Sequence, residues 1–149
     1  MPSWQTIKMD NFKIGKALKI LKEQKSKLPH ALAEVAQVYF DKSFHQQAWK
    51  GKPWKDVKRH SGKHPDSKPI LQQSGALKAA VSKSLVQADF KRIKFEVTGL
   101  PYAAVHNNGL RAGRGSGFKM PERRFMGRTK ELTKIQRDIM RHYISKIFK

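Results

Sequence analysis

The residue types best suited to chemistry gather between positions 102 and 127. His106 precedes two asparagines, and Ser116 lies in the glycine-rich run 113–117. A serine nucleophile needs the sharp strand-to-helix turn of a Gly-x-Ser-x-Gly elbow, and no strand and helix patterns surround Ser116. The same run lacks the Gly-x-x-x-x-Gly-Lys-Ser/Thr order and the following helix of a phosphate-binding loop. We therefore expect no nucleophilic catalysis in this stretch.

Metal-dependent chemistry is equally poorly supported. A His-Asn nuclease fragment around His106 would need carboxylates close in space, and the eleven acidic residues are scattered singly. His60 and His64 are four residues apart, but they lie in a Gly/Pro/Ser-rich stretch, where this spacing does not place them on one helix face. The chain has no cysteine. The sequence therefore predicts no enzyme, no metal site and no cofactor.

What the stretch does concentrate is positive charge on a flexible connector. Between residues 110 and 128 there are six basic side chains and one acid, Glu122. Because such a loop packs poorly into a core, we expect it to become ordered against an anionic surface or another copy. Five residues are predicted to contact an assembly partner or an anion: Arg111, Arg114, Lys119, Arg123 and Arg124.

The whole chain is strongly basic. Its 149 residues carry a net charge of +21, and seven of its nine arginines follow position 110. Arginine suits phosphate and carboxylate recognition, so a polyanionic neighbour such as DNA, RNA or an acidic protein is one interpretation. Plain solubility is the other. Only Phe118 offers base stacking near the arginines, and no helix-turn-helix or zinc-finger spacing occurs.

Length and hydropathy predict one soluble domain over residues 1–149. The hydrophobic fraction of 38% is low, so either part of the chain is unstructured or part of its surface is buried only in an assembly. No apolar run is long enough for a membrane span, and the N-terminus lacks a signal-peptide pattern, so cytoplasmic synthesis is expected. Residues 1–11 are predicted to be an extended lead-in with Asp10 as N-cap.

Two helices are predicted at the N-terminus. Ile14, Leu18 and Leu21 share one face of the first. Lysines at every third position spiral around it and reach the apolar face at Lys25, so this helix should end near Gln24.

The second helix is expected to begin at Pro29, because proline is tolerated in a first turn and not in an interior. Leu32, Val35 and Tyr39 continue its apolar face, and Phe44 is expected to anchor its end. This helix is the best candidate for the centre of the core.

The middle of the chain predicts a long loop and a small sheet. Two tryptophans, Trp49 and Trp54, can hold the start of a polar, mobile loop over about 50–69. Strict alternation over 92–98 is typical of a strand with one wet face, paired with a strand near 81–86. The segment 76–85 itself stays open between a short helix, an edge strand, and one passing into the other.

The last third predicts a short helix, a second mobile loop and a final helix. Tyr102 to Asn108 can form two helical turns ended by a left-handed Gly109. The connector at about 110–120 is too glycine-rich for a regular element, and Pro121 to Phe125 should be extended. Thr129 can cap the C-terminal helix. The predicted fold is α+β: two N-terminal helices, a small antiparallel sheet, a short helix and a C-terminal helix, with long basic loops.

These patterns, in this order, resemble the phage virion morphogenesis family, the tail-completion proteins of Mu-like tailed phages. The resemblance covers roughly Leu32 to the C-terminal helix. It rests on Ile70-Leu71, Ser74-Gly75 and Leu77, then Tyr102-Ala103-x-Val105-His106-x-x-Gly109, then Pro121-x-Arg123-x-Phe125-x-Gly127, after Phe44 and Gly51-Lys52-Pro53-Trp54. Glu122 and Arg124 depart from the family pattern, in which these places are more often small and proline. The motif anchors are Tyr102, His106, Gly109, Pro121, Phe125 and Gly127.

The resemblance implies a structural protein without catalytic residues. Such proteins complete the tail or the head–tail junction by protein–protein assembly, and they resemble folds that often form rings. The implied partners are other tail or connector proteins and further copies of this chain. The implied location is the virion, after synthesis in the bacterial host cytoplasm. A basic nucleic-acid-binding protein that contacts DNA phosphates is the alternative function.

Overall fold

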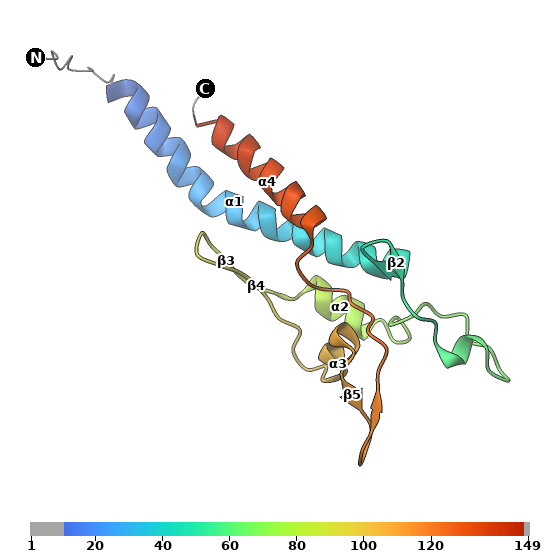
Figure 1. Cartoon of the computed structure of the whole chain (residues 1–149). Coiled ribbons are helices and arrows are strands. Elements are labelled where there is room, and N and C mark those ends of the chain that lie inside the picture. The colour runs from blue at the N-terminus through green and yellow to red at the C-terminus, as the bar shows by residue number, and fades with distance from the viewer. Residues whose placement is uncertain (1–10, 148–149) are drawn as a thin grey trace, which may run out of the picture.

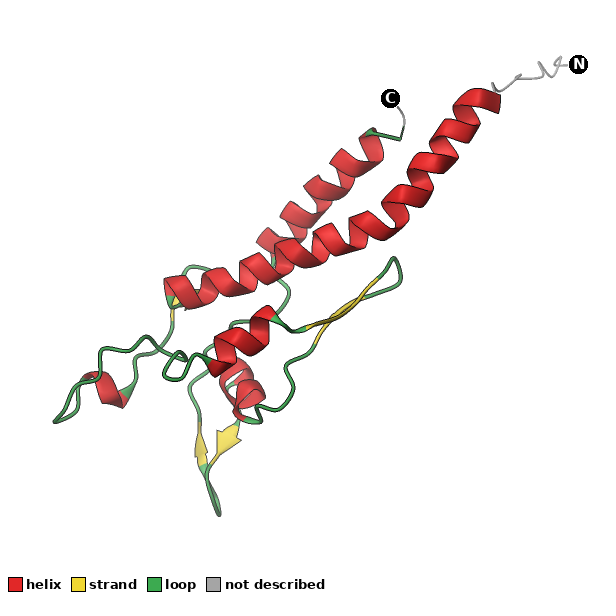
Figure 2. Ribbon diagram, turned by 180° about the vertical axis from the view of Figure 1, so that it is seen from behind, coloured by secondary structure: helices red, strands yellow, loops and turns green. Residues whose placement is uncertain are grey.

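The computed structural model describes residues 11–147, which form four α-helices and three two-stranded antiparallel sheets (Figure 1). This confirms the α+β class. The longest element is a helix that runs across the molecule, with the C-terminal helix beside it and the smaller elements on its other side (Figures 1 and 2). The helices are α1 (Asn11–Gln46), α2 (Ala76–Ser82), α3 (Tyr102–Asn108) and α4 (Lys130–Ser145), with a 3-10 turn, η1 (Lys58–His60).

The sheets are small hairpins distributed along the chain. Strand β1 (Ala48–Trp49) pairs with β2 (Lys52–Pro53), and β5 (Arg111–Ala112) pairs with β6 (Phe118–Lys119). The largest hairpin pairs β3 (Leu85–Ala88) with β4 (Ile93–Phe95), with a register shift between Leu85 and Gln87. The predicted pairing of the alternating strand with its predecessor is confirmed, but the predicted bounds are wrong: the partner is 85–88 instead of 81–86, and β4 is shorter than the alternation over 92–98. The open segment before it is a helix, α2, that passes into β3.

The prediction of two N-terminal helices is wrong, because α1 is one helix of 36 residues with Pro29 inside it. Lys25 is exposed, and Leu18 and Leu21 are 54% and 47% exposed, so no buried face penalises a lysine there. Proline removes one backbone hydrogen bond and bends a helix. Figure 2 shows α1 changing direction partway along its length. The proposed lead-in and the Asp10 cap lie outside the described residues, except that Asn11 already belongs to α1.

The core lies along the C-terminal half of α1. Phe44 is 1% exposed and packs edge-on against Trp54, with ring centroids 5.7 Å apart. Aromatic pairs in this geometry stabilise more than their buried area alone. Trp49 and Trp54 are both buried, as predicted for the start of the following loop. The remaining buried apolar side chains around this centre are Ala36, Phe40, Ile70, Leu77, Val81, Ala103, Phe125 and Leu132.

Helix α4 is fixed to α1 by its first turns. The Thr129 hydroxyl accepts a hydrogen bond from the Leu132 amide at 2.9 Å, which confirms the predicted N-cap. The Tyr39 hydroxyl donates to Glu131 Oε2 at 3.0 Å, and the Gln136 side-chain amide donates to the Leu32 carbonyl. Among the described helices, none is long and apolar enough to cross a bilayer.

Candidate functional site

Helix α3 starts the stretch that holds the predicted site. Gly109 ends it in the left-handed conformation, with φ 62° and ψ 43°, as the sequence predicts. A Cβ atom at this position would lie 3.0 Å from the Cβ of Glu122. Glycine therefore does two things here: it adopts the positive φ angle, and it lets the returning chain pass close to the end of α3.

The returning chain is held to α3 by the side chain of Asn107. Its Oδ1 accepts hydrogen bonds from the amides of Phe125 and Met126, both at 3.0 Å, and its Nδ2 donates to the Met126 carbonyl at 3.2 Å. The backbone of Arg123 adds a hydrogen bond to the His106 carbonyl at 2.8 Å. This role of Asn107 was not predicted from the sequence, where the only indication was an amide side chain at the end of a short helix.

Residues 121–127, called the clamp below, place two side chains, Arg123 and Phe125, in the interior. Phe125 is 2% exposed, and its ring centroid lies 5.5 Å from that of Phe44. The indole Nε1 of Trp54 donates to the Arg124 carbonyl at 2.8 Å. The Ser43 hydroxyl, also buried, lies 3.5 Å from the Phe125 carbonyl. The clamp is therefore held in two ways: its phenylalanine packs in the core, and side chains of other segments contact its backbone carbonyls.

Arg123 is a buried part of the clamp and is not available to a large partner surface. It is 4% exposed, and its guanidinium donates to the carbonyls of Lys55 at 2.8 Å and Asp56 at 3.1 Å. Burial lowers the pKa of Arg123, and repulsion from Arg59 lowers it further, while Asp56 acts in the opposite direction. Its structural effect is to join the clamp to the segment that follows β2.

The connector before the clamp, residues 110–120, contains the β5–β6 hairpin, called the basic hairpin below. The expectation that it holds no regular element is wrong, because the Met120 amide donates to the Leu110 carbonyl at 3.0 Å and closes the ladder. At the turn, Gly117 has φ 58°, and a Cβ there would lie 2.5 Å from the Ala112 carbonyl oxygen. Glycines therefore permit this hairpin rather than prevent it. It points away from α1 in Figure 1.

Three of the predicted contact residues lie on the basic hairpin. Arg111, Arg114 and Lys119 are exposed. The Arg111 guanidinium donates to the Ser116 carbonyl across the turn, which restrains its direction. Phe118 is 56% exposed beside them. Arg124 lies apart, at the base, in an ion pair of 3.3 Å with Glu122.

The His106 ring lies between α3 and the clamp. It contacts Tyr102 edge-on at 6.3 Å, so the two predicted anchors share a face as expected. Its Nδ1 is buried and has no hydrogen-bond partner among residues 11–147. Burial lowers the pKa of His106, and the positive charge of Arg123 lowers it further. The neutral imidazole is therefore favoured at this position.

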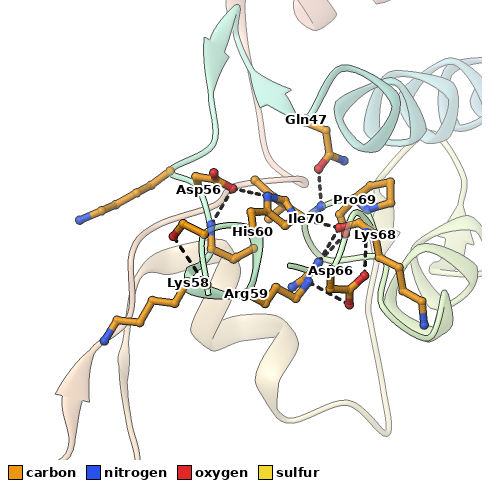
Figure 3. Close-up of polar contacts among 12 residues, drawn as sticks. Gln47, Asp56, Lys58, Arg59, His60, Asp66, Lys68, Pro69 and Ile70 are labelled. Carbon is orange, nitrogen blue, oxygen red and sulfur yellow. Dashed lines mark hydrogen bonds and ion pairs between the residues drawn. The ribbon is translucent and has the colours of Figure 1, made fainter. Parts of the chain in front are cut away.

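The segment between β2 and α2 has its own polar network, shown in Figure 3. His60 pairs with Asp56 through Nδ1, and its Nε2 lies 2.9 Å from the Lys68 carbonyl. Arg59 Nη2 donates to the carbonyls of Lys68 and Pro69, both at 2.8 Å. The hydrogen bond that the Val57 amide donates to Asp56 Oδ1 lowers the pKa of that carboxyl, and His60 and Arg123 lower it further, while desolvation acts in the opposite direction.

A second basic feature, which sequence reasoning missed, lies at the start of α4. Five basic side chains and two threonines line an open concavity of about 570 Å³, and no acid lines it. The basic residues come from two segments, the β1–β2 turn and the stretch 128–137: Lys50, Arg128, Lys130, Lys134 and Arg137. No sequence spacing could have joined Lys50 to the others, because the β1–β2 turn brings it there.

Comparison with known proteins gives one match. The model of the phage virion morphogenesis family matches residues 10–145, which is most of the chain. No curated protein and no solved structure matches it.

Proposed function

The chain belongs to the phage virion morphogenesis family, and on that premise we propose that it completes the tail or the head–tail junction. The family is structural and implies no catalysis. In this proposal the protein acts by binding other tail or connector proteins and becomes a component of the virion. Its synthesis would take place in the cytoplasm of the bacterial host.

The observation that carries this proposal is the contrast between a firmly anchored clamp and the exposed basic hairpin next to it. Phe125 and Asn107 fix both the side chain and the backbone of the clamp. Arg111 and Arg114 are therefore presented from a fixed base on a short hairpin. A contact element held in this way loses little conformational entropy on binding, which favours assembly.

Uncovered apolar residues on the two long helices support assembly as well. Leu18 and Leu21 on α1 and Ile144 on α4 are each about half exposed. Exposed apolar residues that gather on neighbouring elements are typical of interaction surfaces. We propose that this face is covered by another copy of the chain in the completed oligomer. Because each copy carries +21, repulsion should oppose that oligomer until acidic partners or salt reduce it.

The decisive experiment is genetic and structural. A phage that lacks this gene should produce filled heads and tails that fail to form infectious particles, seen by negative-stain electron microscopy of the lysate. Expression of the chain from a plasmid should restore infectivity. A normal yield of infectious particles without the gene would refute the proposed function.

Light scattering during size-exclusion chromatography tests the oligomer. The purified chain should be monomeric at low salt and should associate at high salt, because screening removes the repulsion between copies. If a second copy covers this face, the chain should no longer associate at high salt when Leu18 and Leu21 are changed to serine. Val38→Ser is the matched control, because Val38 is 69% exposed in the other half of α1. Association that persists in the double variant would reject this face.

Direct contact with DNA phosphates is the second candidate function, favoured by the cation-lined concavity at the start of α4. Five basic side chains without an acid repel one another, and a polyanion relieves that repulsion. In a ring, this surface or the basic hairpin would line a lumen through which DNA passes. An assembled ring with both on its outside would contradict the lumen.

A DNA titration separates the two functions. If the chain is an assembly protein, affinity for free duplex DNA at physiological salt should be weak. If it is a DNA-binding protein, affinity should be high and fall steeply with salt, with a slope reduced by about 1 for each phosphate-contacting cation removed. Lys134→Gln and Arg137→Gln test the concavity, and Lys63→Gln, in the loop after η1, is the control.

A further inference from the structure

A small pocket lies where α3, the clamp and the segment after η1 meet. Its volume is about 190 Å³. The basic side chains at its wall are Arg59, His106 and Arg123, which come from three separate segments of the chain. Apolar and neutral polar residues complete the lining: Val57, Leu71, Gln73, Ser74, Leu77 and Tyr102. The pocket therefore combines cations with an apolar wall.

The three basic groups around this pocket have unused hydrogen-bonding capacity. Arg59 Nε lies 3.6 Å from Asp66 Oδ2, beyond hydrogen-bond distance, and has no acceptor within residues 11–147 (Figure 3). His106 Nδ1 also has no partner in that part of the chain. Arg123 uses Nε and Nη2 on backbone carbonyls, while Nη1 meets only the Met120 sulfur, at 4.0 Å.

Charge compensation at the pocket is incomplete. Asp66 lies beside Arg59, and Asp56 is paired with His60. Neither acid lines the pocket. Burial lowers the pKa of Arg123, and the positive charge of Arg59 lowers it further. A buried donor without an acceptor is destabilising, and an anion between the two guanidinium groups would supply the missing acceptor.

We propose that this pocket binds the side-chain carboxylate of a glutamate presented by a protein partner. Two guanidinium groups suit the flat, bidentate oxygen pair of a carboxylate. The aliphatic stem of glutamate would lie against Leu71 and Leu77. A phosphodiester of duplex DNA is disfavoured, because a rigid polyanion cannot insert one phosphate between apolar walls without desolvating its neighbours.

Binding of a defined peptide to the full chain tests this directly. The probe is a capped five-residue peptide with one central glutamate between alanines and glycines, and the same peptide with glutamine is its control. Two-dimensional NMR should show the glutamate peptide shifting the amides of Arg59, Leu71 and His106 in 150 mM salt. The pKa of the His106 ring should rise on binding, because a nearby carboxylate favours the charged imidazole. Shifts of equal size with glutamine would overturn the proposal.

Matched variants separate the pocket from the general positive charge. Arg59→Gln should weaken glutamate-peptide binding by about tenfold or more, the loss expected for one charge-assisted hydrogen bond, while Arg114→Gln on the basic hairpin should not. If Arg59→Gln disturbs folding, Ser74→Glu places a competing carboxylate at the pocket wall, and Ser116→Glu makes the same charge change elsewhere. Equal weakening by both members of a pair would overturn the site.

Inorganic phosphate is the remaining arm of the experiment. If phosphate shifts the amides of the pocket residues and the glutamate peptide does not, the pocket is a phosphate site and the proposal is refuted. The identification of the partner as another virion protein rests on the proposed function, whereas peptide binding does not. If the peptide does not bind but the plasmid-borne chain restores infectivity, only the pocket proposal is refuted. If the peptide binds but the chain is not needed for infectivity, only the assembly function is refuted.

Discussion

The clamp and the basic hairpin are consecutive in the chain and alike in composition, yet they differ completely in environment. Arg123 in the clamp is 4% exposed and donates to two backbone carbonyls. Arg114 in the hairpin is exposed. Phe125 is 2% exposed, whereas Phe118 is 56% exposed. The same residue types are thus buried in one segment and exposed in the next.

This difference shows that a run of basic residues is not by itself a binding surface. Counting charges between 110 and 128 places five contact residues in one group. The folded backbone gives these residues different environments. Asn107 holds the clamp against α3, and Arg123 of the clamp is buried. Arg111, Arg114 and Lys119 of the basic hairpin are exposed, as are the basic residues around the start of α4. Matched substitutions in the two segments measure how complete the separation is.

The largest effect is expected from the phenylalanine pair. Phe125→Ala should lower the free energy of unfolding by about 4 kcal/mol, because it removes a buried aromatic ring and leaves a cavity beside Phe44. Phe118→Ala should change it by less than about 0.5 kcal/mol, since its ring is mostly exposed. Urea denaturation followed by circular dichroism measures both. Similar losses in the two variants would contradict the division into core and surface.

The arginine pair should follow. Arg123→Gln is expected to lower stability by about 3 kcal/mol, because charge-assisted hydrogen bonds to the carbonyls of Lys55 and Asp56 are lost. Arg114→Gln should leave stability within about 0.5 kcal/mol of wild type but reduce genetic complementation. The same denaturation curves and a plaque assay provide the two readouts. A stable Arg123→Gln chain would show that the clamp is held without this side chain.

The asparagine pair tests the polar attachment of the clamp. Asn107→Ala should lower the free energy of unfolding by about 2 kcal/mol, because the partly buried amides of Phe125 and Met126 lose their acceptor. Asn108→Ala, at the next position, is exposed and should have little effect. Hydrogen exchange adds a local measurement, and the Phe125 amide should exchange faster only in the Asn107 variant. Unchanged exchange would exclude this attachment.

The smallest effect concerns pH. The folded state lowers the pKa of His106 below its ordinary value of 6.5, so the unfolded chain binds a proton first as pH falls. This contribution to stability is complete above about pH 6.5 and decreases as the pH falls below that value toward the folded-state pKa. His106→Gln should flatten the pH dependence between pH 7 and 5, and His64→Gln, an exposed control, should not. Identical profiles in all three chains would refute the assignment.

Several elements could be predicted because local physics alone determines them. The capped α4, the short α3 with Gly109 at its end, and the alternating strand β4 depend on residues within a few positions of one another. The anchoring roles of Phe44 and the tryptophans also followed from the sequence, since large aromatic residues next to a loop are usually buried. Their partners were not predictable, because Trp54 meets Arg124 across 70 positions.

The failures have a common physical reason. The spiral of lysines predicted a helix end near Gln24, but a lysine disfavours a helix only where the helix face is buried, and this half of α1 is exposed. The glycines of the connector predicted irregular chain, but the β5–β6 turn uses positive φ angles that glycine supplies. In both cases, burial or turn geometry decided between two structures that the local sequence allows.

The sequence by itself determined the α+β class, the family, the positive charge and the residues of the stretch from Tyr102 to Gly127. The tertiary structure alone decided which of those residues face inward. It joined Arg59, His106 and Arg123 around one pocket and Lys50 to the basic start of α4. Charge is a property of each side chain, whereas burial depends on contacts between segments far apart in the chain, and only the folded chain specifies those contacts.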